Sequence, residues 1–128
     1  MTRTDWVRRT KVLTSKYPEH FTKKLLEHHT SLAKLHDATL QQNQDPWYTL
    51  DATSNALDKH PQYAPEIFKL AHAILQKNQN AANTLYTASE ALDKHAPKNI
   101  FEVAYAALAS QLNAAQAINN YVKTFFVA

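Results

Sequence analysis

The chain has 128 residues, a formal net charge of +3, no cysteine and no glycine. This length is typical of a single domain, and the absence of cysteine excludes disulfide scaffolds and thiolate metal sites. The absence of glycine excludes phosphate-binding loops, the nucleophile elbow and the EF-hand loop, because each needs glycine at fixed positions.

Prolines divide the chain into five predicted helices and no strand. Proline stands at the first position of a helix at Pro18, Pro46, Pro65 and Pro97, and Asp45 is a suitable N-cap. The predicted helices cover residues 4–15, 18–42, 46–59, 65–94 and 97–125. The sequence therefore predicts an all-α fold, a compact antiparallel bundle of four or five helices. We expect one domain over residues 1–128, with residues 1–17 as a basic amphipathic helix or arm.

The last two predicted helices, 65–94 and 97–125, have the most regular pattern. Apolar and small residues keep heptad spacing along both, interrupted by Asn78 and Gln111. The short connection between them predicts a long C-terminal helical hairpin, which we expect to be the spine of the fold. Asn78 and Gln111 are then expected to be buried amides that fix how the two helices pair.

A short internal repeat accompanies this pattern. Residues 56–60 (ALDKH) recur as residues 91–95, and residues 67–75 resemble residues 100–108. A spacing near 34 residues is that of tetratricopeptide repeats. Against that interpretation, the usual glycine, tryptophan and tyrosine are missing, and the heptad runs through residues 77–80, where such a repeat turns. The sequence favours a duplicated helix end and helix start over a true repeat.

The seven histidines do not form a metal-binding pattern. Ligands on one helix must be three or four residues apart to meet at one ion, whereas His28 and His29 are adjacent and His36 lies seven residues further on. His60 and His95 lie at predicted helix ends, where the dipole favours a cationic imidazole. No serine or carboxylate arrangement of a known catalytic type is visible. We expect a non-enzymatic protein with no catalytic residues, no metal and no cofactor.

The N-terminus carries the basic character of the chain. The first 24 residues hold seven basic and two acidic residues, a net +5, and the remainder sums to −2. On a helix, Trp6 and Leu13 face one side and most cations face the other. Such a face suits a protein partner, a nucleic acid or another polyanion, or an anionic surface; the alternative is the solvated side of a docked helix. The candidate partner-binding residues are Arg3, Arg8, Arg9, Lys11, Lys16, Lys23 and Lys24.

Apolar residues gather at the C-terminus. The predicted helix 97–125 is apolar on two faces, so we expect it to be covered by helices 18–42 and 46–59, or else to meet a second copy in a homodimer. The residues proposed for an apolar interface are Trp6, Tyr121, Phe125 and Phe126.

The stretch from 80 to 124 resembles the phasins, helical proteins that coat polyhydroxyalkanoate granules. The resemblance lies in residues 88–92 (ASEAL), a proline-containing break, residues 100–103 (IFEV) and the Ala- and Gln-rich stretch 104–117. It implies a protein that lays an amphipathic face on a hydrophobic granule or lipid surface, and it brings no catalytic residues.

Together these features predict a helical binding module that acts by protein–protein interaction, of inhibitor, immunity or adaptor type. The alternatives are a phasin-like binder of hydrophobic surfaces and a nucleic-acid or polyanion binder. No apolar run reaches the ~18 residues of a membrane span, and the start lacks a secretory signal, so we expect a cytoplasmic protein without a transmembrane segment.

Overall fold

The computed structural model describes residues 3–21 and 23–125, without the side chains of residues 3–7, 9, 10, 23 and 24. Over these residues the predicted all-α fold is confirmed, since every regular element is a helix. Within the described ranges, seven α-helices and two short 3₁₀ helices follow one another: α1 (Arg3–Lys16), η1 (Lys23–His28), α2 (His29–Gln41), α3 (Pro46–Lys59), η2 (Pro61–Tyr63), α4 (Ala64–Gln76), α5 (Ala81–Leu92), α6 (Pro97–Ala109) and α7 (Ala114–Lys123).

The prediction of a long C-terminal helical hairpin is wrong. The predicted helix 65–94 is divided into α4 and α5, and the predicted helix 97–125 into α6 and α7. Asn78 and Gln111, which we expected to be buried amides, are exposed loop residues with φ of 58° and 60°. A left-handed residue cannot continue a right-handed helix, so the backbone ends there. The predicted helix 18–42 likewise becomes α-helical only at His29.

Three loops with the same construction join α2 to α3, α4 to α5 and α6 to α7. Each contains one left-handed residue, Asn43, Asn78 or Gln111. The backbone N–H of the residue after it donates to a carbonyl in the last turn of the preceding helix. An example is the Gln44 N–H, which donates to Thr39 O at 3.1 Å, and this arrangement is a Schellman motif. Each loop then ends in an N-cap whose side chain accepts a backbone N–H, and these caps are Asp45, Asn80 and Asn113. Asparagine or glutamine therefore fills the place that glycine usually takes.

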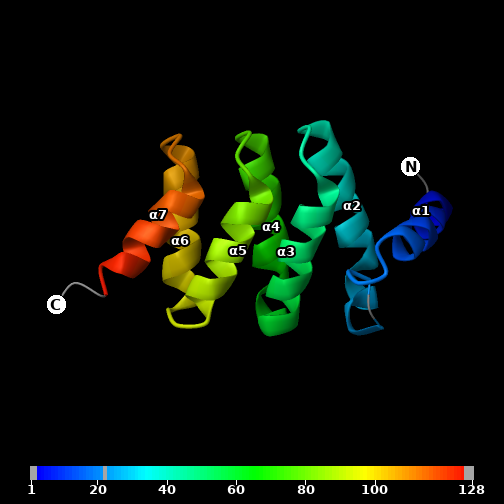
Figure 1. Ribbon diagram of the computed structural model, residues 1–128, viewed down its shortest axis with the longest axis horizontal. Coiled ribbons are helices and arrows are strands. Elements are labelled where there is room, and N and C mark those ends of the chain that lie inside the picture. Colours follow the sequence, from blue (N-terminus) through cyan, green and yellow to red (C-terminus); the bar gives the residue numbers. More distant parts are fainter. Residues whose placement is uncertain (1–2, 22, 126–128) are drawn as a thin grey trace.

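The loops lie 35 and 33 residues apart, and they define three successive helical hairpins. The hairpins stand side by side along the longest axis, with α1 at one end and α7 at the other (Figure 1). The first helices, α2, α4 and α6, contact one another in sequence, as do the second helices, α3, α5 and α7. The internal echo therefore reflects a structural repeat, contrary to our expectation. The arrangement is that of an α-solenoid, in which each unit packs on its neighbours.

Two glutamines connect consecutive hairpins through equivalent hydrogen bonds. Gln44 Nε2 donates to Gln79 O at 2.6 Å, and Gln44 Oε1 accepts from Ala81 N–H at 3.2 Å. One hairpin later, Gln79 Nε2 donates to Leu112 O at 2.7 Å, and Gln79 Oε1 accepts from Ala114 N–H at 2.9 Å. Each glutamine thus satisfies backbone groups at the loop of the next hairpin.

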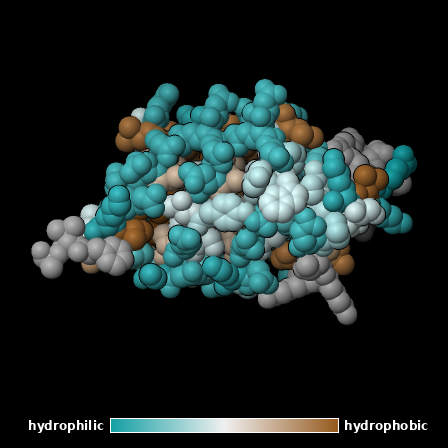
Figure 2. Space-filling view, in the orientation of Figure 1, coloured by the Kyte–Doolittle hydropathy of each residue, from teal (hydrophilic) through white to brown (hydrophobic). Residues whose placement is uncertain are grey.

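The apolar residues of the heptad stripes form the core between the hairpins. Fully buried members on the central and last hairpins include Ala71, Ile74, Ile100 and Ile118. Hydrophilic side chains cover most of the face seen in Figure 2, with residues of intermediate hydropathy among them. None of the helices within the described ranges is long and apolar enough to span a membrane.

Replacing Gln111 by glycine is expected to raise the free energy of unfolding by about 0.5–1 kcal/mol. A left-handed conformation costs a residue with a Cβ roughly 1–2 kcal/mol, and part of this gain is offset by the greater freedom of glycine in the unfolded chain. Asn78→Gly should gain less, because asparagine tolerates this conformation better than glutamine. Thermal and urea denaturation of both variants measure the difference. A Gln111→Gly protein less stable than the parent would contradict this account of the loops.

Candidate functional site

The basic N-terminal residues lie on α1 and on the segment that follows it. Arg8, Lys11 and Lys16 are exposed. A small groove of about 280 Å³ separates α1 from α2, with Val12 and Leu13 as its apolar lining and Arg8, Lys16 and His36 beside them. The side chains of Arg3, Trp6, Arg9, Lys23 and Lys24 lie outside the described residues, so the predicted basic face is only partly placed.

The apolar residues predicted at the C-terminus pack against one another. The rings of Tyr121 and Phe125 have centroids 5.2 Å apart, and the His95 ring lies 4.6 Å from Phe125 and 5.9 Å from Tyr121. Phe125 remains 59% exposed. Phe126 lies outside the described residues. Tyr121 therefore belongs to an intramolecular aromatic cluster more than to a free surface.

The histidines have separate environments. His60 Nε2 lies 2.9 Å from Asp93 Oδ1 and so links the ends of the first and second hairpins. The His28 ring lies 5.9 Å from that of Phe68, and the His36 ring lies 5.7 Å from that of Tyr17, both in tilted arrangements. Burial lowers the pKa of His72, and the nearby charge of Lys34 lowers it further. Across the described part of the chain, no group of three or more His, Asp or Glu side chains is placed to hold a metal ion.

His20 is buried between two carboxylates. Its Nε2 lies 3.5 Å from Glu19 Oε1, and its Nδ1 lies 3.8 Å from Asp51 Oδ1. Trp47 Nε1–H donates to Glu19 at 2.8 Å, and the Tyr86 hydroxyl donates to Asp51. The backbone hydrogen bond of Glu19 and then this indole bond lower its pKa, whereas burial and the Asp51 bond raise the pKa of Tyr86. These contacts tie the segment before η1 to α3 and α5.

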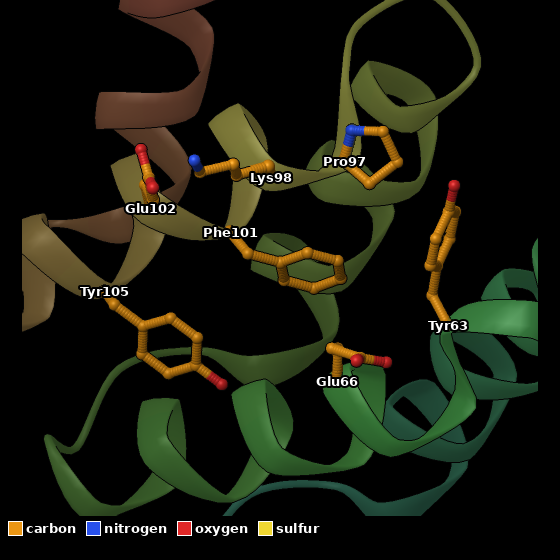
Figure 3. Close-up of a pocket in the computed structure, with 7 residues that line it drawn as sticks. All are labelled: Tyr63, Glu66, Pro97, Lys98, Phe101, Glu102 and Tyr105. Atoms are coloured by element: carbon orange, nitrogen blue, oxygen red, sulfur yellow. The ribbon is translucent and has the colours of Figure 1, made fainter.

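A cleft of about 490 Å³ lies between α4 and α6, the first helices of the second and third hairpins. Three rings line it together with a proline, and three charged side chains stand around them (Figure 3). The lining residues are Tyr63, Glu66, Pro97, Lys98, Phe101, Glu102 and Tyr105.

Short-range helix signals set these side chains in place. Pro97 begins α6, and Phe101 and Tyr105 follow at successive turns on one side of that helix. Tyr63 ends η2, just before α4 begins, and its ring meets that of Phe101 edge to face with centroids 6.4 Å apart. Figure 3 shows the Phe101 ring in the middle of the group, with Tyr63 on one side of it and Tyr105 on the other. The result is an aromatic floor shared by two hairpins.

The polar groups of the cleft are unevenly matched. Lys98 and Glu102 lie one turn apart on α6 and point to the same side of the cleft (Figure 3), and with Glu66 they give the cleft a net charge of −1. Glu66, on α4, has no ion-pair partner among the residues that the structure places. The Tyr105 hydroxyl is buried and has no hydrogen-bond partner within the described structure. Burial raises the pKa of Tyr105, and the charge of Glu66 raises it further, so the hydroxyl stays protonated at neutral pH.

The sequence pattern did not predict this cleft. Phe101 and Tyr105 belong to the second apolar face of the predicted helix 97–125, which we expected helices 18–42 and 46–59 to cover. The structure instead places α4 beside α6. The signal in the sequence was the 33-residue echo, which aligns α4 with α6 and so predicts that these helices are neighbours in a solenoid.

No known family model, curated protein or solved structure matches the chain.

Proposed function

We propose that the protein is a non-enzymatic helical-repeat module that holds a segment of a partner protein in the cleft between α4 and α6. The observation that supports this most is the aromatic floor of Phe101, Tyr63 and Tyr105. Aromatic side chains contribute more than most residues to protein interfaces, and they do so in partly enclosed pockets. Solenoids use the row formed by equivalent helices as an extended binding surface.

Polyanion binding through the basic N-terminus is the second candidate function. It is favoured by exposed Arg8, Lys11 and Lys16 on one helix. Contact with phosphates loses affinity steeply as salt rises, whereas an aromatic cleft does not depend on salt in that way. Binding of a double-stranded DNA oligomer at low salt that disappears at ~0.5 M salt would favour the basic face.

A phasin-like role and a cytoplasmic location remain predictions from the sequence. A granule-binding protein would partition onto hydrophobic particles and would unfold with little cooperativity in their absence. A solenoid whose apolar stripes are internal should melt in one sharp transition. Partition onto hydrophobic beads, compared with thermal melting, separates these two behaviours.

Replacing the aromatic floor is expected to weaken peptide binding about tenfold or more. Peptides are first selected from a displayed library of random sequences against the whole chain, and their Kd is measured by fluorescence anisotropy. Phe101→Leu keeps an apolar side chain in the core but removes the ring. Tyr63→Ala removes the second ring of the aromatic floor. Loss of an aromatic anchor typically costs ~2 kcal/mol or more, and ~1.4 kcal/mol is a factor of ten in Kd.

Tyr48→Ala is the matched control, because Tyr48 is an exposed aromatic residue on α3. It should bind selected peptides with unchanged Kd. Melting curves of all three variants check that each is folded at the assay temperature. Selected peptides that bind Phe101→Leu and Tyr63→Ala as tightly as the parent would reject the α4–α6 cleft as the binding site.

A further inference from the structure

We infer that the segment held in the α4–α6 cleft is a peptide in which an apolar residue stands beside a lysine or arginine. This inference rests on the proposed function and adds the chemistry of the occupant. It follows from two features of the cleft: an apolar floor and one more carboxylate than cation around it. Each feature constrains a different part of the peptide.

The floor determines the anchor. Phe101 is 9% exposed, so its ring offers only a limited area at the base of the cleft. Tyr63, Pro97 and Tyr105 surround that area (Figure 3). An aliphatic, proline or aromatic side chain buries apolar surface against these rings, whereas a polar side chain would lose its hydration without a partner.

The charges determine the neighbour of the anchor. The three charged side chains of the cleft, Lys98 and Glu102 on α6 and Glu66 on α4, sum to −1, and Glu66 is the one on the α4 side. Glu66 lines the cleft and is exposed, so its carboxylate is accessible to an occupant. A lysine or arginine beside the anchor residue would face this carboxylate. An acidic residue there would be repelled by it.

Three series of fluorescein-labelled twelve-residue peptides test the inference. The series differ in the residue beside the central position, which is lysine, glutamine or glutamate. Within each series, the central residue is leucine, proline or phenylalanine in a serine- and alanine-rich background. Fluorescence anisotropy gives the Kd for the whole protein. We expect the lysine series to bind about fivefold more tightly than the glutamine series, as for one exposed ion pair, and the glutamate series to bind most weakly.

Variants assign this preference to its source. Glu66→Gln should bring the lysine and glutamine series to within about twofold, while Glu102→Gln should leave a preference of about fivefold. Both carboxylates are exposed, so their variants should fold.

The outcomes separate this inference from the function on which it rests. If the peptides bind, Phe101→Leu weakens them and the three series do not differ, the basic neighbour is wrong and the cleft remains the binding site. A preference that survives Glu66→Gln also overturns the inference. If none of the series binds saturably, and the library selection yields no peptide sensitive to Phe101→Leu, the proposed function fails together with the inference.

Discussion

Replacing Leu85 by alanine is expected to lower the free energy of unfolding by about 2–5 kcal/mol, the largest loss among single changes considered for this fold. Leu85 is 2% exposed on α5. Helix α5 contacts α3, α4, α6 and α7, so it belongs to the interfaces on both sides of the central hairpin. Truncation removes the contacts of the leucine methyl groups and leaves a cavity that four surrounding helices cannot fully close.

Urea denaturation followed by far-ultraviolet circular dichroism measures this loss. Leu112→Ala is the matched control, because Leu112 is 60% exposed and its truncation should change stability by less than about 0.5 kcal/mol. In a solenoid, weakening the central unit also weakens the coupling between the ends, so the transition of Leu85→Ala should broaden. Equal effects of the two variants would show that α5 does not form the central packing layer.

The sequence predicted most helices and the residues that they bury. Apolar residues at helical spacing predict a buried face because one side of a helix must be covered. Ile67, Ile74, Leu85, Ile100 and Ile118 were placed on such stripes, and all five are buried in the structure. The helix 46–59 was predicted with the bounds of α3, since Asp45 and Pro46 give a strong start signal.

The heptad pattern did not predict where the long helices break. Spacing along the sequence is unaffected by a short loop, so Ile74, Asn78 and Ala81 stay in register although the backbone reverses between them. The loop signal was nevertheless present. Residues 78–80 (NQN) repeat residues 43–45 (NQD), which we had already placed between two helices. In a chain without glycine, asparagine is the residue to examine for a left-handed helix end.

The candidate cleft depends on a further level of structure. Tyr63 and Glu66 come from one hairpin, and Phe101 and Tyr105 from the next, so their proximity follows from the stacking of hairpins. Helical periodicity contains no information on that stacking. The equivalence of α4 and α6 in the internal echo does, once the echo is interpreted as a structural repeat.

Replacing Gln79 by alanine is expected to lower the free energy of unfolding by about 1–3 kcal/mol. The side chain donates to Leu112 O and accepts from Ala114 N–H, so its loss leaves two backbone groups of the next loop without these partners. Ala114 N–H lies in the first turn of α7, where no helical carbonyl is available to it. Unsatisfied groups of this kind cost roughly 1–3 kcal/mol when water cannot reach them freely.

The equivalent glutamine and an exposed one complete the experiment. Gln44→Ala breaks the same pair of bonds between the first and second hairpins and should cost a comparable amount. Gln76→Ala removes an exposed glutamine from the last turn of α4 and should be nearly neutral. Gln79→Glu tests the mechanism, because a carboxylate can still accept from Ala114 N–H near a helix N-terminus but cannot donate to Leu112 O.

In urea denaturation, the free energy of unfolding of Gln79→Glu should therefore lie between those of Gln79→Ala and the parent protein. Native-state hydrogen exchange adds a local measure, since loss of the Gln79 bonds should speed exchange first in α6 and α7, and loss of the Gln44 bonds first in α2 and α3. The two glutamines would then be the residues that make three hairpins unfold as one unit. If Gln79→Ala were as stable as Gln76→Ala, apolar packing alone would account for that cooperativity.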